Sequence, residues 1–280
     1  MQKNMRKRGN KEMTSKLLKY DIRSEFRTMW MFWAAAPVIG LIVCFVKWGY
    51  SRLQLFDVPV QFVGELARGL SIVAFIACMV ALTVFTIVVV ITRFYKGLIG
   101  QEGYLMHTLP AKPWQLITSR GIAAFITIVI SSIVALISFG CLDGFSLFKD
   151  MAELIGSLFD AFNKEPRYIF VAFEVLIIMA VSVLKTVYKF YASMSVGQLF
   201  DKHRVLCSLL AFVLISIVLS VIGVFGLSGI DSLSADFEVT IDDFQEINIL
   251  AGIMLFIELA QAALFYVITE RIISKKLNLL

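Results

Sequence analysis

The sequence predicts an all-α protein that spans a membrane with six helices. Apolar residues make up 59% of the 280 positions and charged residues only 17%, whereas soluble domains average roughly 45–50% apolar and about 25% charged residues. The apolar residues are gathered in six runs, each long enough for the roughly 20 residues with which a helix crosses a bilayer. Because these runs do not alternate apolar with polar residues, both a membrane β-barrel and an ordinary soluble enzyme are excluded.

The six predicted spans are continuous apolar segments, and the second, third and fifth contain no charged residue. They cover residues 30–48, 69–92, 121–142, 168–189, 205–227 and 247–269. We expect a single domain, 1–280, in which the membrane part is 30–269, the preceding cytoplasmic segment is 1–29 and the tail is 270–280. The first span is too long, and its basic leader too extended, for a cleaved signal peptide.

The lysines and arginines predict the orientation of the spans. Twenty of the 26 lie in the N-terminal segment, the second loop, the fourth loop together with Lys185 and Lys189 before it, or the C-terminal tail. The other loops hold thirteen acidic residues. Positive residues near span ends are retained on the cytoplasmic side, so both termini are predicted to be cytoplasmic in a multi-pass protein of the cell membrane. The net charge of +5 is spread between spans, which argues against a nucleic-acid partner.

Residues 13–29 are predicted to form an amphipathic helix ahead of the first span. Apolar residues recur there at helical spacing: Met13, Leu17, Leu18, Ile22, Phe26 and Met29. Lysines and arginines occupy the other faces, as in helices that lie among anionic headgroups. We expect this interfacial helix to end where the chain turns into the bilayer, and a simple positively charged anchor remains an open alternative.

Two of the expected outer loops differ in character. Residues 143–167 carry apolar residues at a helical period, which predicts a short helix on the outer surface. Residues 228–246 carry six acidic residues and no basic residue. Because their spacing is not that of a calcium-binding loop, we interpret them as a solvated acidic cap rather than a metal site.

The loop between the second and third spans, about residues 93–120, is the most specific segment. Its glycines permit tight turns, and Pro110 and Pro113 are placed to end one helix and start the next. Between the glycines and Pro110 lies a short apolar surface with a polar rim. The surface consists of Tyr104, Leu105, Met106 and Leu109, and the rim of Glu102, His107 and Lys112. Such a surface on a cytoplasmic loop indicates a protein partner.

The stretch Glu102-Gly103-Tyr104-Leu105, followed by Thr108-Leu109-Pro110, resembles the integral-membrane permease subunits of ABC-type exporters of the type-two class, especially those of Gram-positive bacteria. The position of this stretch between the second and third of six spans is similar to that in the family, and so is the amphipathic helix before the first span. The resemblance covers the whole topology but only one motif. The family more often continues after the proline with a small apolar residue and then Ser, whereas here Ala111 is followed by Lys112 and Pro113.

The resemblance implies a type-two ABC exporter permease whose loop forms a coupling helix that docks on a separate ATP-binding subunit. Carried over residue by residue, this contact consists of Glu102, Gly103, Tyr104, Leu105, Thr108, Leu109 and Pro110. It also implies a homodimer or a pair with a second permease subunit, and a lipid, hydrophobic drug or antimicrobial peptide as substrate. ATP and Mg²⁺ would be bound by the partner, because this chain has no GxxxxGK[ST] motif.

Glu258 is a candidate site residue because it lies near the middle of the sixth span, where an ionised carboxylate costs about 2.5 kcal/mol or more. Gln261 lies one turn further along the same face. Either both residues belong to a translocation path or coupling network, or the carboxyl group only holds two helices together. We interpret Lys185 and Lys189, one turn apart in the fourth span, as anchors that reach the headgroups.

No catalytic or metal site is expected. The two histidines lie on different loops without a nucleophile at fitting spacing, and the four cysteines show no CxxC pattern. An ATP-independent secondary transporter is the alternative function, and it predicts inverted repeats and interrupted helices. A membrane-bound protease is a third alternative, which would require a second acidic or histidine residue at the depth of Glu258.

Overall fold

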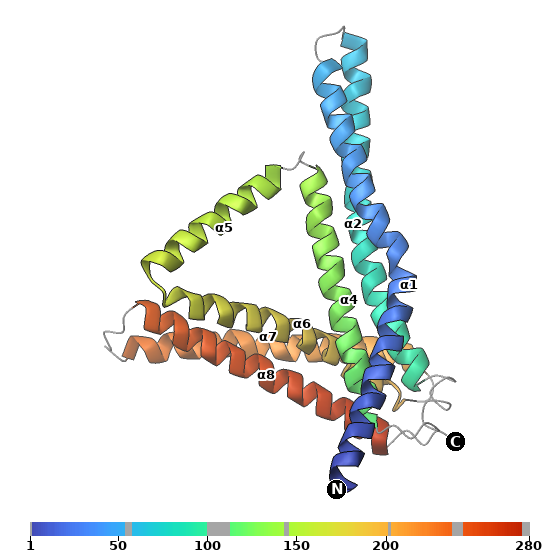
Figure 1. Cartoon of the computed structure of the whole chain (residues 1–280), viewed down its shortest axis with the longest axis vertical. Helices are drawn as coiled ribbons and strands as arrows, with labels where there is room; N and C mark the ends of the chain where they lie inside the picture. Colours follow the sequence, from blue (N-terminus) through green and yellow to red (C-terminus); the bar gives the residue numbers. More distant parts are fainter. Residues whose placement is uncertain are drawn as a thin grey trace. The chain divides into compact units, whose positions relative to one another are not determined.

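The computed structural model describes residues 2–53, 58–99, 113–142, 146–200, 203–236 and 243–275. Within these ranges the chain is helical apart from short turns, and the described residues include no strand. The elements are α1 (Gln2–Leu53), α2 (Val58–Phe94), the π-helix η1 (Tyr95–Ile99), α4 (Pro113–Leu142), α5 (Ser146–Lys164), α6 (Tyr168–Gly197), α7 (Arg204–Asp236) and α8 (Asp243–Lys275) (Figure 1). As the sequence predicts, Pro113 begins a helix, where its missing N–H costs no hydrogen bond.

Six described helices are long and apolar enough to cross a membrane, and each overlaps one of the six predicted spans. They cover Thr14–Ser51, Phe62–Gly97, Pro113–Leu142, Tyr168–Gly197, Arg204–Gly223 and Asn248–Ser274. Strand-forming residues such as Val and Ile adopt helices here because a helix satisfies every backbone hydrogen bond within one segment, which lipid requires. The chain therefore has the helices of a multi-pass membrane protein.

The described helices form two compact units. One comprises Ser15–Thr92 and Ala123–Lys164, and in it parts of α1, α2 and α4 pack around a buried apolar core. The core residues are Met29, Trp33, Ala36, Leu82 and Val89. Two hydrogen bonds converge on the buried Ser131 hydroxyl of α4, from the Trp33 indole at 2.9 Å and from the Thr86 hydroxyl at 3.1 Å.

The expected turn between an interfacial helix and the first span is wrong, because α1 continues without a break from Gln2 to Leu53. Residues 13–29 are helical, as predicted. However, Met29 is fully buried and Glu25 is only 3% exposed, and the Thr127 hydroxyl of α4 donates a hydrogen bond to the Glu25 carboxylate. The inner part of this segment therefore packs against protein, and no glycine or proline between Met13 and Trp30 interrupts the helix.

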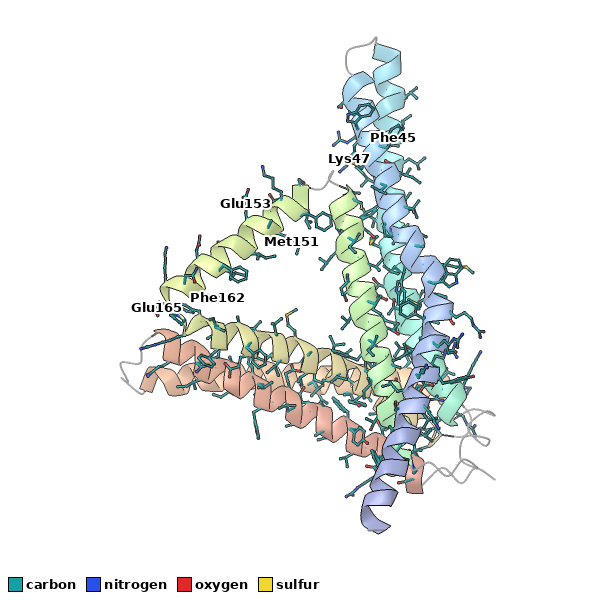
Figure 2. The ribbon with its side chains drawn as sticks, in the orientation of Figure 1. Phe45, Lys47, Met151, Glu153, Phe162 and Glu165 are labelled. Carbon is teal, nitrogen blue, oxygen red and sulfur yellow. The ribbon has the colours of Figure 1, made fainter. Side chains whose placement is uncertain are left out.

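Helix α5 confirms the helix predicted within residues 143–167, and it belongs to the same unit. It has no buried residue. Met151 and Phe162 project from one side of the helix and Glu153 from the other, as Figure 2 shows. This separation of apolar and charged side chains is the pattern of a helix at a membrane surface.

The second unit comprises Met1–Thr14, Arg93–Ile122 and Glu165–Leu280. Its main body is formed by α6, α7 and α8, which lie side by side, with α6 in contact with both of the others (Figure 1). Helices α6 and α8 run in the same direction and α7 runs against them. At the α6–α7 turn, the Gly197 position leaves no room for a Cβ, which would lie 2.6 Å from the Ser208 backbone nitrogen.

Candidate functional site

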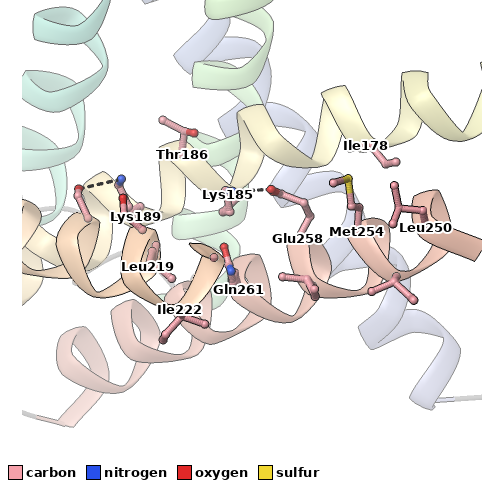
Figure 3. A pocket seen from close by; sticks show the side chains of 15 residues that line it. Ile178, Lys185, Thr186, Lys189, Leu219, Ile222, Leu250, Met254, Glu258 and Gln261 are labelled. Carbon is pink, nitrogen blue, oxygen red and sulfur yellow. Dashed lines mark hydrogen bonds and ion pairs between the residues drawn. The ribbon is translucent and has the colours of Figure 1, made fainter. Parts of the chain in front are cut away.

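Helices α6, α7 and α8 line a cavity of about 580 Å³ near the middle of their lengths (Figure 3). A cavity of this size lies within the usual range of small-molecule sites. Each helix contributes polar residues about one turn apart, so that three short polar stripes face one another. These residues are Lys185 and Lys189 from α6, Ser216 and Ser220 from α7, and Glu258 and Gln261 from α8. Polar groups at this depth are costly in lipid, which makes the cavity the candidate functional site.

An ion pair between α6 and α8 lies in this cavity. The Lys185 ammonium nitrogen is 2.6 Å from Glu258 Oε1, and the two side chains are only 20% and 21% exposed. The second carboxylate oxygen of Glu258 is buried and has no hydrogen-bond partner among the described residues. The pair offsets the cost of placing each charge among apolar helices and leaves one acceptor oxygen available.

Lys189 lies one turn beyond Lys185 on α6. Its ammonium group donates a hydrogen bond of 3.0 Å to the Ser216 hydroxyl of α7 and lies 4.5 Å from the centre of the Phe212 ring. Both lysines therefore reach into the helix bundle. The structure therefore differs from the interpretation of Lys185 and Lys189 as headgroup anchors, because their ammonium groups bind Glu258 of α8 and Ser216 of α7.

Gln261 lines the same cavity as Glu258, three residues further along α8. The structure thus places the two sequence-predicted residues Glu258 and Gln261 together. It also adds Lys185 and Lys189, whose part in the site sequence reasoning missed. Their spacing of four residues was the available signal, because it puts both charges on one face of the span.

Glu174 is a second acidic residue on α6. Its Oε2 is buried without a hydrogen-bond partner among the described residues, and its Oε1 lies 4.0 Å from the point where Gly252 of α8 would carry a Cβ. Glu174 therefore lies at the α6–α8 contact, nearer than Lys185 to the start of α6. Since it does not line the cavity, we do not include it in the site.

Residues at the two ends of the 93–120 loop contact α6 and each other. The Arg120 guanidinium of α4 donates a hydrogen bond of 2.5 Å to the Arg93 carbonyl, and the same guanidinium fills the space where a side chain at Gly97 would stand. Tyr191 of α6 donates from its hydroxyl to the Arg120 carbonyl at 3.3 Å. Its ring stacks on Phe94 at 3.9 Å between centroids and 10° between planes. One buried tyrosine thus contacts both sides of the loop.

A second connection runs from the start of α4 to α8. The hydroxyl groups of Thr118 and Tyr266 are 3.1 Å apart, and Tyr266 packs edge-on against Tyr188 of α6. The space beside Gly121 is filled by the Tyr188 ring. The first turns of α4 are therefore in contact with the same two helices that carry the ion pair.

The predicted contact residues of the loop, Glu102, Gly103, Tyr104, Leu105, Thr108, Leu109 and Pro110, lie outside the described residues. Their assignment remains a prediction from the sequence. Among the residues that the structure does describe, no group of three or more His, Cys, Asp or Glu side chains is placed to hold a metal ion. Comparisons with protein-family models, with curated proteins and with solved structures give no match to this chain.

Proposed function

We propose that this chain is the permease subunit of an ATP-driven ABC-type exporter of the type-two class in the cell membrane. The observation that carries the proposal is the sequence Glu102-Gly103-Tyr104-Leu105 with Thr108-Leu109-Pro110, located between the second and third of six spans. The exposed apolar pair Tyr104 and Leu105 expected there suits the groove of a partner protein. The chain has no Walker A sequence, so ATP and Mg²⁺ would be bound by a separate subunit.

The contacts around the loop support this proposal because they give a displacement of the loop a route to the cavity. Tyr191 contacts Phe94 at the start of the loop and Arg120 at its end. It lies on α6, six residues beyond Lys185. A movement imposed on the loop by an ATPase would reach α6 through rigid, buried contacts, and a shift of α6 against α8 would separate Lys185 from Glu258.

Such a shift would change the cavity between two arrangements, one with the ion pair closed and one with it open. In the open arrangement the two charges would need new partners, which a substrate or water would supply. In the closed arrangement the pair stabilises the helix contact. The permease would act as a homodimer or with a second permease subunit, and its termini would be cytoplasmic.

The test is co-purification of the partner. The tagged chain is isolated from its native host in mild detergent, and the co-eluting proteins are identified by mass spectrometry. We expect an ATPase with a Walker A motif in stoichiometric amount. The double substitution Tyr104→Asp and Leu105→Asp should abolish its recovery, because a carboxylate in an apolar groove is left unpaired.

The matched control is Tyr104→Phe with Leu105→Met, which changes the same two positions and keeps the apolar contact. This variant should retain the ATPase. Full recovery of the ATPase with the Asp variant, or its reproducible absence from the wild-type preparation, would count against the proposal.

A secondary transporter is the second candidate, and the Lys185–Glu258 pair favours it. Ionisable pairs within spans are typical of proton and ion pathways. This candidate predicts uptake or efflux by the chain alone in vesicles with an imposed proton gradient and no nucleotide. The ABC proposal predicts that such vesicles are inactive until the ATPase and ATP are added.

A further inference from the structure

The cavity between α6, α7 and α8 has an unbalanced charge. Its lining holds two ammonium groups, Lys185 and Lys189, and one carboxylate, Glu258. The carboxylate is taken by Lys185 at 2.6 Å. Lys189 contacts the neutral Ser216 hydroxyl and the Phe212 ring, and the other polar residues in the described part of the lining carry no charge. The described lining therefore has a net charge of one positive unit, located at Lys189.

An uncompensated ammonium group in a membrane span costs about 2.5–3.5 kcal/mol. A hydroxyl group and an aromatic ring offset only a part of that cost. The remaining cost is removed when an anion enters the cavity beside Lys189. A dianion would overcompensate the single charge, so the electrostatics favour a group with one negative charge.

The two ends of the cavity differ in polarity. At one end Lys189 and Gln261 lie beside Leu219 and Ile222, and at the other end the labelled residues Ile178, Leu250 and Met254 are all apolar, as Figure 3 shows. Ile178 and Lys189 are eleven residues apart on α6, which corresponds to about 16 Å along a helix. A hydrocarbon segment of the ligand fits against the apolar end, because Ile178, Leu250 and Met254 have no polar side-chain group to satisfy.

We propose that this cavity binds an amphiphile with a single negative charge, with the anionic head at Lys189 and the hydrocarbon toward Leu250. A free fatty acid and the phosphodiester of a membrane lipid share this chemistry. The Lys185–Glu258 pair is already neutral and helps to form the wall. The inference extends the proposed transport function by naming a substrate class, and it rests on that function only for the statement that the bound molecule is transported.

The test is equilibrium binding of defined probes to the purified full chain in detergent. Oleate is compared with oleyl alcohol, which has the same hydrocarbon and no charge. Phosphatidylglycerol is compared with phosphatidylcholine of the same acyl chains. We expect each monoanion to bind at least about tenfold more tightly than its neutral or zwitterionic counterpart. Binding of oleate alone indicates a free fatty acid, and binding of phosphatidylglycerol alone indicates a membrane lipid.

Two variants locate the site. Lys189→Gln should remove the preference for the monoanion. Lys149→Gln on the exposed helix α5 lowers the net charge of the chain by the same unit and should keep the preference. The exposed charge on α5 is therefore the matched control for the half-buried charge in the cavity.

The proposal is overturned if wild-type protein binds oleate and oleyl alcohol equally, or if Lys149→Gln reduces the preference as much as Lys189→Gln does. The comparison of probes on wild-type protein decides the question even if Lys189→Gln is not recovered in folded form. Binding in detergent needs no ATPase, so the two proposals can fail separately. If no ATPase co-purifies but the preference for oleate is present, the exporter function is refuted and the ligand class of the cavity stands. If an ATPase co-purifies but oleate is not preferred, the ligand class is refuted and the exporter function stands.

Discussion

Neutralising one member of the Lys185–Glu258 pair should destabilise the α6–α8 contact, whereas neutralising both should not. The two charges are 2.6 Å apart, and with an effective dielectric constant of about 20 their attraction is about 6 kcal/mol. Desolvation of both groups cancels the larger part of this attraction. A single substitution leaves the other charge without its partner in the span, which costs about 2–3 kcal/mol.

We therefore expect Lys185→Gln and Glu258→Gln each to lower the free energy of unfolding by about 2–3 kcal/mol. The double variant should lie within about 1 kcal/mol of wild type, because two amides form a neutral, hydrogen-bonded contact. The interaction energy from this double-mutant cycle should be at least about 2 kcal/mol. The measurement is unfolding by sodium dodecyl sulfate in mixed micelles, followed by circular dichroism.

The control is Glu174→Gln, which removes a carboxylate from the same helix contact without breaking an ion pair. Combined with Lys185→Gln, it should give additive effects. If the Lys185→Gln and Glu258→Gln effects are also additive within about 0.5 kcal/mol, the pair is not coupled, and the account of α6 and α8 as the two sides of the site is refuted.

Two further predictions concern the unit formed by α1, α2 and α4. Gly40→Ala should destabilise the protein by about 1–3 kcal/mol in the same unfolding assay, because its Cβ would lie 2.6 Å from the Ser138 carbonyl oxygen. A Cβ at Gly49 on the same helix meets no atom within 4 Å, so Gly49→Ala should be neutral or stabilising. Equal effects of the two substitutions would contradict the packing. Trp33→Phe should lower the free energy of unfolding by about 1 kcal/mol or more, because the hydrogen bond to Ser131 is lost. Trp30→Phe, at an exposed position, should lower it by less than about 0.5 kcal/mol. A larger effect at Trp30 than at Trp33 would show that Trp33 is not the buried donor.

The number and positions of the spans could be predicted from the sequence because bilayer thickness and backbone hydrogen bonding leave few alternatives. Helix α5 could be predicted for a similar reason, since an apolar stripe at helical spacing is a local property of residues 146–164. The unbroken continuation of α1 into the first span could not be predicted from the sequence. It depends on whether Met29 and Glu25 meet lipid headgroups or another helix, and in the structure they are buried in the protein.

The ion pair was missed for a related reason. Glu258 and Lys185 are 73 residues apart, and no local pattern connects them. The fourth and sixth spans run in the same direction, so residues at equal depth can be compared directly. Lys185 follows the start of α6 by 17 residues, and Glu258 follows the start of α8 by 15. That comparison of depths is the signal that would have paired them.

Site-specific photo-crosslinking in the native host shows directly whether position 104 contacts an ATPase. A photoreactive phenylalanine analogue replaces Tyr104 in one strain and the exposed Leu154 of α5 in another, and the crosslinked proteins are identified by mass spectrometry. An ABC permease predicts a Walker A ATPase crosslinked from position 104 and not from position 154. The same products from both positions, or a product from position 104 without any ATPase, would contradict the proposal.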